Sequence, residues 1–289
     1  MGLIEEFERL TPWLLERRGL ARRYVSTPRG HIHLFDGPGR GAGAPLLFLH
    51  GLGSRAADYA LLMSRLRHRT RRLIAPDVPG HGSSPMPVGG MSVPTVEAAL
   101  LSAVDQVLDE PAIVLGNSMG GFAAIRFALA RPHRVRALVL MSPGGAPEPD
   151  IQAFLKRFEL NSRADALWFI DRFLGRPSRL RPLLAAGVQS RMMARGPRAL
   201  VESVRDVDML KPHELSGLSM PILMVWGRED GVLTPQQLSF FRQHLPPHAQ
   251  ISTPARTGHV PYLDDMSGLI EMIESFLDRL PATRAARTG

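Results

Sequence analysis

The sequence of 289 residues contains no cysteine. Disulfide bonds, a thiol nucleophile and cysteine-based zinc or iron–sulfur sites are therefore excluded. No apolar run approaches the ~18 residues that a membrane-spanning helix needs. The N-terminal residues are acidic and lack the basic start and apolar stretch of a secretory signal. We therefore expect a cytoplasmic protein without stable membrane insertion.

Lysine is also scarce. Lys156 and Lys211 are the only lysines among the 35 lysine and arginine residues. Arginine therefore carries most of the positive charge behind the net charge of +8. The densest basic stretch, Arg65–Arg72, lies where a predicted helix ends, and cations are favourable at a helix C-terminus. No interleaved aromatic residue or binding motif accompanies it, so we predict no nucleic-acid partner.

His31 and His33 alternate along one predicted strand without a visible third or fourth ligand, and we expect neither a metal nor a cofactor.

The sequence does contain a regular alternation of short apolar runs and helical segments. A hairpin with its turn at residues 28–30 comes first. The later runs are near-continuous, as is typical of parallel strands covered by helices on both faces. The expected strands are Leu46–Leu49, Leu73–Ala75, Ala112–Leu115, Val135–Met141, Ile222–Trp226 and Gln250–Ser252. The expected helices are Ala56–Leu66, Val96–Leu108, Phe122–Ala130, Pro235–His244 and Leu269–Leu280. Length and composition fit one large α/β domain.

Two stretches interrupt this alternation. Residues 142–215 predict several helices and no strand, and we interpret them as an insertion across the carboxyl edge of the sheet, where ligands bind in such folds.

Near the N-terminus, Thr11–Pro12 predicts the end of one short helix and the start of a second. Apolar residues recur there at helical spacing, and we expect them to pack on the main body rather than on a lipid surface. They are Leu3, Ile4, Phe7, Leu10 and Leu14.

The predicted organisation has five parts. Residues 1–21 form an N-terminal helical extension, and residues 281–289 form a loose tail. Residues 22–145 and 214–280 are the two parts of the core. Residues 146–213 form a helical cap that is inserted after the sixth strand.

The predicted strand Ala112–Leu115 runs directly into Gly116-Asn117-Ser118-Met119-Gly120, and a helix-prone segment follows. This G-x-S-x-G pattern occurs once. A strand, a tight turn and a helix are the layout that exposes a serine hydroxyl as a nucleophile. Side chains at positions 116 and 120 would crowd the bend, which explains the two glycines. We therefore predict that Ser118 is the nucleophile.

A serine nucleophile needs a base, and the base needs an acid that orients it. In this layout the acid follows the serine and the histidine follows the acid. Asp230 comes just after the expected strand Ile222–Trp226, and His259 comes just after Gln250–Ser252. We therefore predict Asp230 as the acid and His259 as the base. The alternative acids are Glu229, Asp264 and Asp265.

The oxyanion of an acyl-transfer intermediate is normally stabilised by two backbone N–H groups. One should belong to Met119, because it follows the nucleophile and opens a helix whose dipole favours negative charge. The other should come from the loop after the strand Leu46–Leu49, and we predict the N–H of Leu52.

Five motifs in this order resemble the α/β-hydrolase superfamily over about residues 22–280. They are His50-Gly51-Leu52-Gly53, Asp77-Val78-Pro79-Gly80-His81-Gly82-Ser83, Gly116-Asn117-Ser118-Met119-Gly120-Gly121, Gly227-Arg228-Glu229-Asp230 and Gly258-His259-Val260-Pro261. The resemblance implies the α/β-hydrolase fold, with a central mostly parallel sheet, flanking helices and a helical cap. It also implies a Ser–His–Asp triad at Ser118, His259 and Asp230. A serine at position 118, in place of aspartate, argues against the epoxide hydrolase and haloalkane dehalogenase branches.

We expect a hydrolase that cleaves a small-molecule carboxylic ester with a small or medium, mainly apolar acyl chain. The segment around Ser118 is also similar to that of the meta-cleavage-product hydrolases, which cleave carbon–carbon bonds, although Tyr262 stands near the place where those enzymes usually carry tryptophan. The alternatives are therefore such a carbon–carbon hydrolase and a ligand-binding protein that keeps the fold without catalysis. The oligomeric state is left open. The cap residues expected to supply an apolar wall are Phe154, Leu155, Phe158, Trp168, Phe169, Phe173, Met192 and Met193.

Overall fold

The computed structural model describes the backbone of residues 3–281 and the side chains of residues 10–281. Eight strands form one sheet in the order β1-β2-β4-β3-β5-β6-β7-β8. Strand β2 is antiparallel to β1 and β4, and the pairs from β4 to β8 are parallel. The mostly parallel sheet predicted from the sequence is confirmed. The strands are β1 (Ala21–Thr27), β2 (Gly30–Pro38), β3 (Leu46–Leu49), β4 (Arg72–Pro76), β5 (Ala112–Ser118), β6 (Val135–Pro143), β7 (Ile222–Val225) and β8 (Gln250–Ser252).

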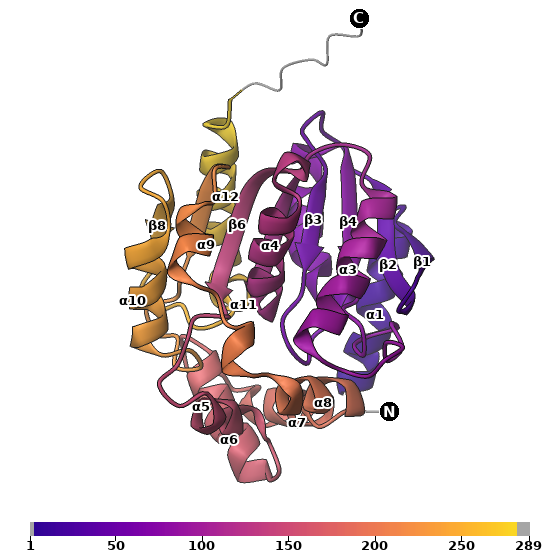
Figure 1. The fold of residues 1–289 in the computed structure, drawn as a ribbon. Helices are drawn as coiled ribbons and strands as arrows, with labels where there is room; N and C mark the ends of the chain where they lie inside the picture. The colour runs from indigo at the N-terminus through magenta and orange to yellow at the C-terminus, as the bar shows by residue number, and fades with distance from the viewer. Residues whose placement is uncertain (1–2, 282–289) are drawn as a thin grey trace, which may run out of the picture.

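Helices cover both faces of the sheet (Figure 1). Alternate residues of β3 enter opposite apolar clusters, because successive side chains of a strand point to opposite faces. Helices α3, α4 and α10 contribute to the cluster on one face, and α1, α2 and α12 contribute to the other. These helices are α1 (Leu3–Arg17), α2 (Ala60–Leu66), α3 (Val93–Val107), α4 (Met119–Ala130), α10 (Pro235–His244) and α12 (Met266–Asp278). Burial on both faces explains why the central strands are almost purely apolar.

The N-terminal segment differs from the prediction. One continuous helix, α1, includes Pro12, so the expected break at this residue is wrong. Proline removes a single helical hydrogen bond, and the helix stays docked because Leu15 is buried in the core. The packing prediction is also wrong for Leu10, which is 55% exposed, but Leu14 does pack against the core. The side chains of Leu3, Ile4 and Phe7, and residues 282–289 of the predicted tail, lie outside the described residues.

Between β6 and β7 the chain forms helices and no strand. Figure 1 shows α5 to α8 gathered beyond one end of the sheet, at the edge where β6 and its parallel neighbours end. Helix α9 instead packs beside α10. The helices of this segment are α5 (Ile151–Leu155), α6 (Arg163–Phe173), α7 (Arg181–Met192), α8 (Arg195–Ser203) and α9 (Pro212–Ser216). The loops that carry the predicted site residues lie at this same edge, because parallel strands share one carboxyl end.

Candidate active site

Ser118 lies on the tight bend between β5 and α4. Its backbone has φ 55° and ψ −121°, a region that residues other than glycine rarely occupy. A Cβ atom at Gly120 would lie 1.9 Å from the Leu49 carbonyl oxygen, and one at Gly116 would lie 2.2 Å from the Gly120 carbonyl oxygen. The bend therefore requires both glycines, as the sequence indicated. It holds Ser118 beside the first turn of α4.

Asp230 and His259 form a buried pair, although 29 residues separate them. The imidazole Nδ1 lies 2.9 Å from Asp230 Oδ2, and the exposed fractions of the two side chains are 4% and 0%. Asp230 Oδ1 accepts hydrogen bonds from the Val232 and Leu233 N–H groups, at 2.9 and 3.2 Å. The carboxylate is thus held from both sides. With Nδ1–H donating to it, the other ring nitrogen of His259 is free to accept a proton.

Asn117 links the segments that carry Ser118 and His259. Its side-chain amide donates to the Met141 carbonyl oxygen at 2.9 Å and to the His259 carbonyl oxygen at 3.0 Å. Among the described residues, no hydrogen bond joins the Ser118 hydroxyl to His259. Such catalytic bonds often tighten only when substrate is bound. The structure therefore brings Asp230 and His259 into contact and holds the backbone next to Ser118 against the His259 loop.

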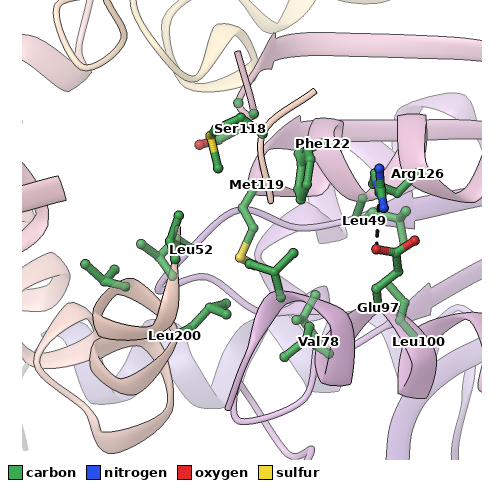
Figure 2. Close-up of a pocket in the computed structure, with 18 of the residues that line it drawn as sticks. Leu49, Leu52, Val78, Glu97, Leu100, Ser118, Met119, Phe122, Arg126 and Leu200 are labelled. Atoms are coloured by element: carbon green, nitrogen blue, oxygen red, sulfur yellow. Dashed lines mark hydrogen bonds and ion pairs between the residues drawn. The ribbon is translucent and has the colours of Figure 1, made fainter. Parts of the chain in front are cut away.

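The two amides predicted to stabilise an oxyanion lie near Ser118. Met119 is the first residue of α4, where helical N–H groups lack partners within the helix. Leu52 lies in the turn after β3, and its N–H has no backbone acceptor among the described residues. The side chains of Leu52 and Met119 line the same cavity as Ser118 (Figure 2).

The alternative acids have other partners. Glu229 Oε2 accepts from the Thr257 N–H at 3.0 Å, and the backbone N–H groups of Arg256 and Thr257 lower the pKa of this carboxyl group. Asp265 caps α12. Asp264 Oδ2 accepts from the backbone N–H groups of Gly175 and Gly258. Among the four acids considered, Asp230 is therefore the one bonded to His259.

Three contacts fasten the helical segment between β6 and β7 to the loop that carries His259. The His259 N–H donates to the Phe173 carbonyl oxygen at 2.9 Å. Asp264 Oδ2, on α11 (Pro261–Asp264), accepts from the N–H groups of Gly175 at 3.0 Å and Gly258 at 2.8 Å. A Cβ atom at Gly175 would lie 2.5 Å from the Gly258 nitrogen, so these two backbones touch. This side of the helical segment is therefore anchored on the His259 loop, and this role of Asp264 was not predicted from the sequence.

A mainly apolar cavity opens beside Ser118 and lies between α3 and α4 (Figure 2). Its empty space is about 1200 Å³, including the part open to solvent. Apolar side chains of β3, α5 and α8 complete the wall. Three of the eight cap residues expected in the wall line the cavity: Phe154, Leu155 and Phe158. The other five do not, and Phe169 and Met192 are buried in the apolar core.

The charged residues among those that line the cavity are Glu97 and Arg126. Figure 2 shows this ion pair on the side of the cavity away from Ser118. Arg126 Nε lies 3.2 Å from Glu97 Oε2, and its Nη1 lies 2.9 Å from Oε1 of Glu214 on α9. This ion pair was not predicted from the sequence. The signal was present, because Phe122 and Arg126 follow Ser118 at intervals of four residues, which places both side chains on one face of the helix that begins after Ser118.

Apart from His259, a cluster of buried histidines lies around Asp77. Asp77 Oδ2 lies 2.8 Å from His33 Nδ1, and His50 Nε2 accepts from the Val78 N–H at 2.8 Å. Burial lowers the pKa of His50 and lowers that of His81 to about 3. Burial raises the pKa of Asp77, but the hydrogen bond from His33 and the other contacts outweigh it and hold the pKa below its usual value. His33 is thus bonded to a carboxylate, and the described residues contain no group of three or more His, Asp or Glu that could hold a metal ion.

Comparisons with known proteins show the family and the fold. The model of a family described as "Alpha/beta hydrolase family" matches residues 46–271. The chain is 30% identical over 268 residues to a 2-hydroxy-6-oxo-2,4-heptadienoate hydrolase of Pseudomonas putida, covering 82% of this chain and 90% of that one. It is 27% identical to a pimeloyl-[acyl-carrier protein] methyl ester esterase of Neisseria meningitidis, covering 80% and 92%.

Among solved structures, carboxylesterase CesB of Bacillus subtilis is similar with a TM-score of 0.74. The identity is 21%, and the match covers 94% of this chain and 98% of that one, so this likeness concerns the fold. Within residues 3–281, no helix combines the length and the apolar character needed to cross a membrane.

Proposed function

The chain belongs to the α/β-hydrolase family, and on this premise we propose that it is a serine hydrolase of carboxylic esters. Its substrate carries a small or medium, mainly apolar acyl chain. The observation that carries this proposal is the combination of a buried Asp230–His259 pair, 2.9 Å apart, with an apolar cavity that begins at Ser118. A cavity lined almost wholly by apolar side chains favours hydrocarbon over charged groups.

In the proposed reaction, the Ser118 hydroxyl oxygen attacks the ester carbonyl carbon while His259 Nε2 takes the hydroxyl proton. Asp230 holds the imidazole and stabilises its positive charge. The amides of Leu52 and Met119 stabilise the oxyanion. When the intermediate collapses, the bond to the alcohol oxygen breaks, and His259 gives its proton to the leaving alcohol. Water then attacks the acyl-enzyme by the same route and releases the acid. The reaction needs no cofactor.

The test is a substrate screen on the wild type and the Ser118→Ala variant together. Esters, thioesters, lactones and a vinylogous dienoate would be compared. We expect ester turnover by the wild type and a loss of at least ~10³-fold in the variant. Near-wild-type turnover by Ser118→Ala would remove this residue from the mechanism.

Labelling by an organophosphate separates catalysis from ligand binding without turnover. We expect one label on the folded wild type, on Ser118, and none on the Ser118→Ala variant or on unfolded protein. Failure to label the folded wild type would favour the non-catalytic ligand-binding alternative, because an unactivated serine hydroxyl is a weak nucleophile.

The second candidate is a carbon–carbon hydrolase, and the 30% identity to the dienoate hydrolase of Pseudomonas putida supports it. A dienoate carries a carboxylate, which needs a cationic or hydrogen-bonding partner when buried. In the cavity, however, the guanidinium of Arg126 already contacts two carboxylates. We therefore rank ester hydrolysis first. Faster turnover of the dienoate than of any ester would reverse this order.

A further inference from the structure

The far side of the cavity contains charged groups in an otherwise apolar wall. Phe122 and Arg126 line the cavity from one face of α4, and Ser118, which directly precedes this helix, lines the same cavity. With a rise of 1.5 Å per residue, Arg126 lies about 10 Å along the helix from Met119, the residue that follows Ser118. Figure 2 shows the Glu97–Arg126 ion pair separated from Ser118 by Met119 and Phe122. An acyl chain attached at Ser118 and extended along α4 would therefore end at this ion pair.

We propose that Arg126, Glu97 and Glu214 form a subsite that binds an uncharged hydrogen-bonding group, a hydroxyl above all, at the far end of the acyl chain. This inference rests on the proposed ester hydrolysis at Ser118 and names the class of acyl chain that the same site prefers. The preferred substrate is an ester of a medium-length hydroxy acid whose hydroxyl lies near the end of the chain.

The ion pair leaves both a donor and an acceptor unused. Arg126 donates from Nε to Glu97 and from Nη1 to Glu214, so its Nη2 atom has no hydrogen-bond partner among the described residues. Glu97 accepts through Oε2 and leaves Oε1 without a partner there. A hydroxyl can accept from the guanidinium and donate to a carboxylate oxygen at the same time. A terminal methyl group can do neither.

The local charge selects against an anion. One guanidinium lies between two carboxylates, Glu97 and Glu214, and the three side chains are 20–30% exposed. The group therefore carries a net charge of −1. A carboxylate at the end of the acyl chain would meet this negative charge in a partly desolvated place, where such repulsion is strongest. A neutral hydroxyl avoids the repulsion.

Gln237 on α10 independently indicates a polar ligand. Its side chain is only 1% exposed and lines the cavity. Its Nε2 donates to Glu148 Oε1 at 2.6 Å, and a carboxylate only accepts, so this bond fixes which end of the amide is the oxygen. The remaining atom, Oε1, is buried and has no hydrogen-bond partner among the described residues. Buried acceptors are normally paired, so this atom gives the cavity a second unused acceptor in addition to Glu97 Oε1, and the single hydrogen of a substrate hydroxyl can be donated to either one.

The competing interpretation is that the ion pair only fastens helices together. The chain offers a matched control, because Arg131 at the end of α4 pairs with Asp105 on α3 at 2.8 Å, and neither residue lines the cavity. The variants Arg126→Met and Glu97→Gln remove charge inside the cavity. The variants Arg131→Met and Asp105→Asn remove an ion pair between the same helical segments outside it.

The experiment compares methyl esters of three acids of equal chain length, ending in a methyl, a hydroxyl or a carboxylate group, over a series of lengths. At the length that spans the cavity, we expect the wild type to prefer the hydroxyl over the methyl ending by about tenfold in kcat/KM. The carboxylate ending should be the poorest. Arg126→Met and Glu97→Gln should each reduce the preference for the hydroxyl several-fold, whereas Arg131→Met and Asp105→Asn should leave it unchanged.

Two results would overturn the subsite. One is a wild type that prefers the methyl ending at every length, and the other is an unchanged hydroxyl preference in both cavity variants. If the wild type hydrolyses none of the esters, the proposed function fails instead. Calorimetry with the corresponding non-hydrolysable amides then still tests the subsite, because tighter binding of the hydroxyl ending must depend on Arg126.

Discussion

Replacing Asp264 by alanine should lower both the stability of the protein and its turnover. Asp264 contacts neither the cavity nor the His259 ring in the described hydrogen bonds, but it accepts from the N–H groups of Gly175 and Gly258. Gly258 directly precedes His259. Loss of the carboxylate therefore releases the helical segment between β6 and β7 from the loop that holds the proposed base, and Asp264 is predicted to be a positioning residue.

The magnitude follows from the two hydrogen bonds, at 3.0 and 2.8 Å. A bond to a charged acceptor contributes about 1.5–3 kcal/mol, and leaving a buried N–H unpaired costs about 1–3 kcal/mol. Gly258 is buried, whereas Asp264 is partly exposed and its charge is screened. We therefore expect a loss of about 2–3 kcal/mol in the free energy of unfolding. A displacement of the base by about 1 Å would lower kcat up to ~10²-fold.

The assay combines urea unfolding with ester hydrolysis over a range of pH. Asp265→Ala is the matched control, because the Asp265 side chain caps α12 by accepting from the Gly268 N–H at 3.0 Å and, among the described residues, makes no hydrogen bond to Gly175 or Gly258. The control should lose about 1 kcal/mol of stability and keep its kcat. Asp264→Asn, which keeps an acceptor oxygen, should recover part of the turnover. Equal kcat values for Asp264→Ala and Asp265→Ala would refute the positioning role.

Two further predictions concern the bend and the buried histidines. Gly120→Ala places a methyl group 1.9 Å from the Leu49 carbonyl oxygen. In chemical unfolding, the variant should therefore lose at least several kcal/mol of stability or fail to fold. A stable, active variant would contradict the close backbone approach at this bend. Burial lowers the pKa of His81 from 6.5 to about 3, so His81 is neutral in the folded protein while the unfolded chain takes up a proton below pH 6.5. Above pH 6.5 this proton uptake does not occur, and the neutral His81 has no cost. As the pH falls from 6.5 towards 3, the free energy of unfolding decreases by about 1.4 kcal/mol per pH unit. Between pH 6.5 and 3, the free energy of unfolding should fall less steeply with falling pH in His81→Gln than in the wild type. Equal slopes in the two proteins would refute the assignment.

Much of the fold could be predicted because its signals are local. Each expected strand from Leu46 onward is present. Strands β3 to β7 are buried on both faces and are therefore almost continuously apolar, whereas β8 lies exposed at the edge of the sheet. Hydrophobic spacing was a weaker guide at the edges of the molecule. In α1, spacing alone could not show that Leu15 is buried while Leu10 is 55% exposed, because the rotation of a helix on the core depends on its neighbours.

The candidate site shows the same division. Chain order indicated Asp230 and His259 as acid and base, and the structure brings these two together, but only the folded loop shows why Glu229 and Asp264 bind backbone N–H groups instead. The spacing of Ser118 and Arg126 was visible in the sequence, but the contact of Arg126 with the carboxylates of Glu97 and Glu214 was not.

By itself, the sequence determined the architecture, the tight bend at Ser118 and the order in which the proposed acid and base follow it. These depend on periodicity and on backbone restrictions that act over a few residues. Only the tertiary structure decided which acid contacts His259, which cap residues form the wall, and that Glu214, 88 residues beyond Arg126, adds a second carboxylate to the same guanidinium. Hydrogen bonds and ion pairs act over a few ångströms. Which distant side chains come within that range depends on how helices and loops pack, and spacing along the chain does not specify it.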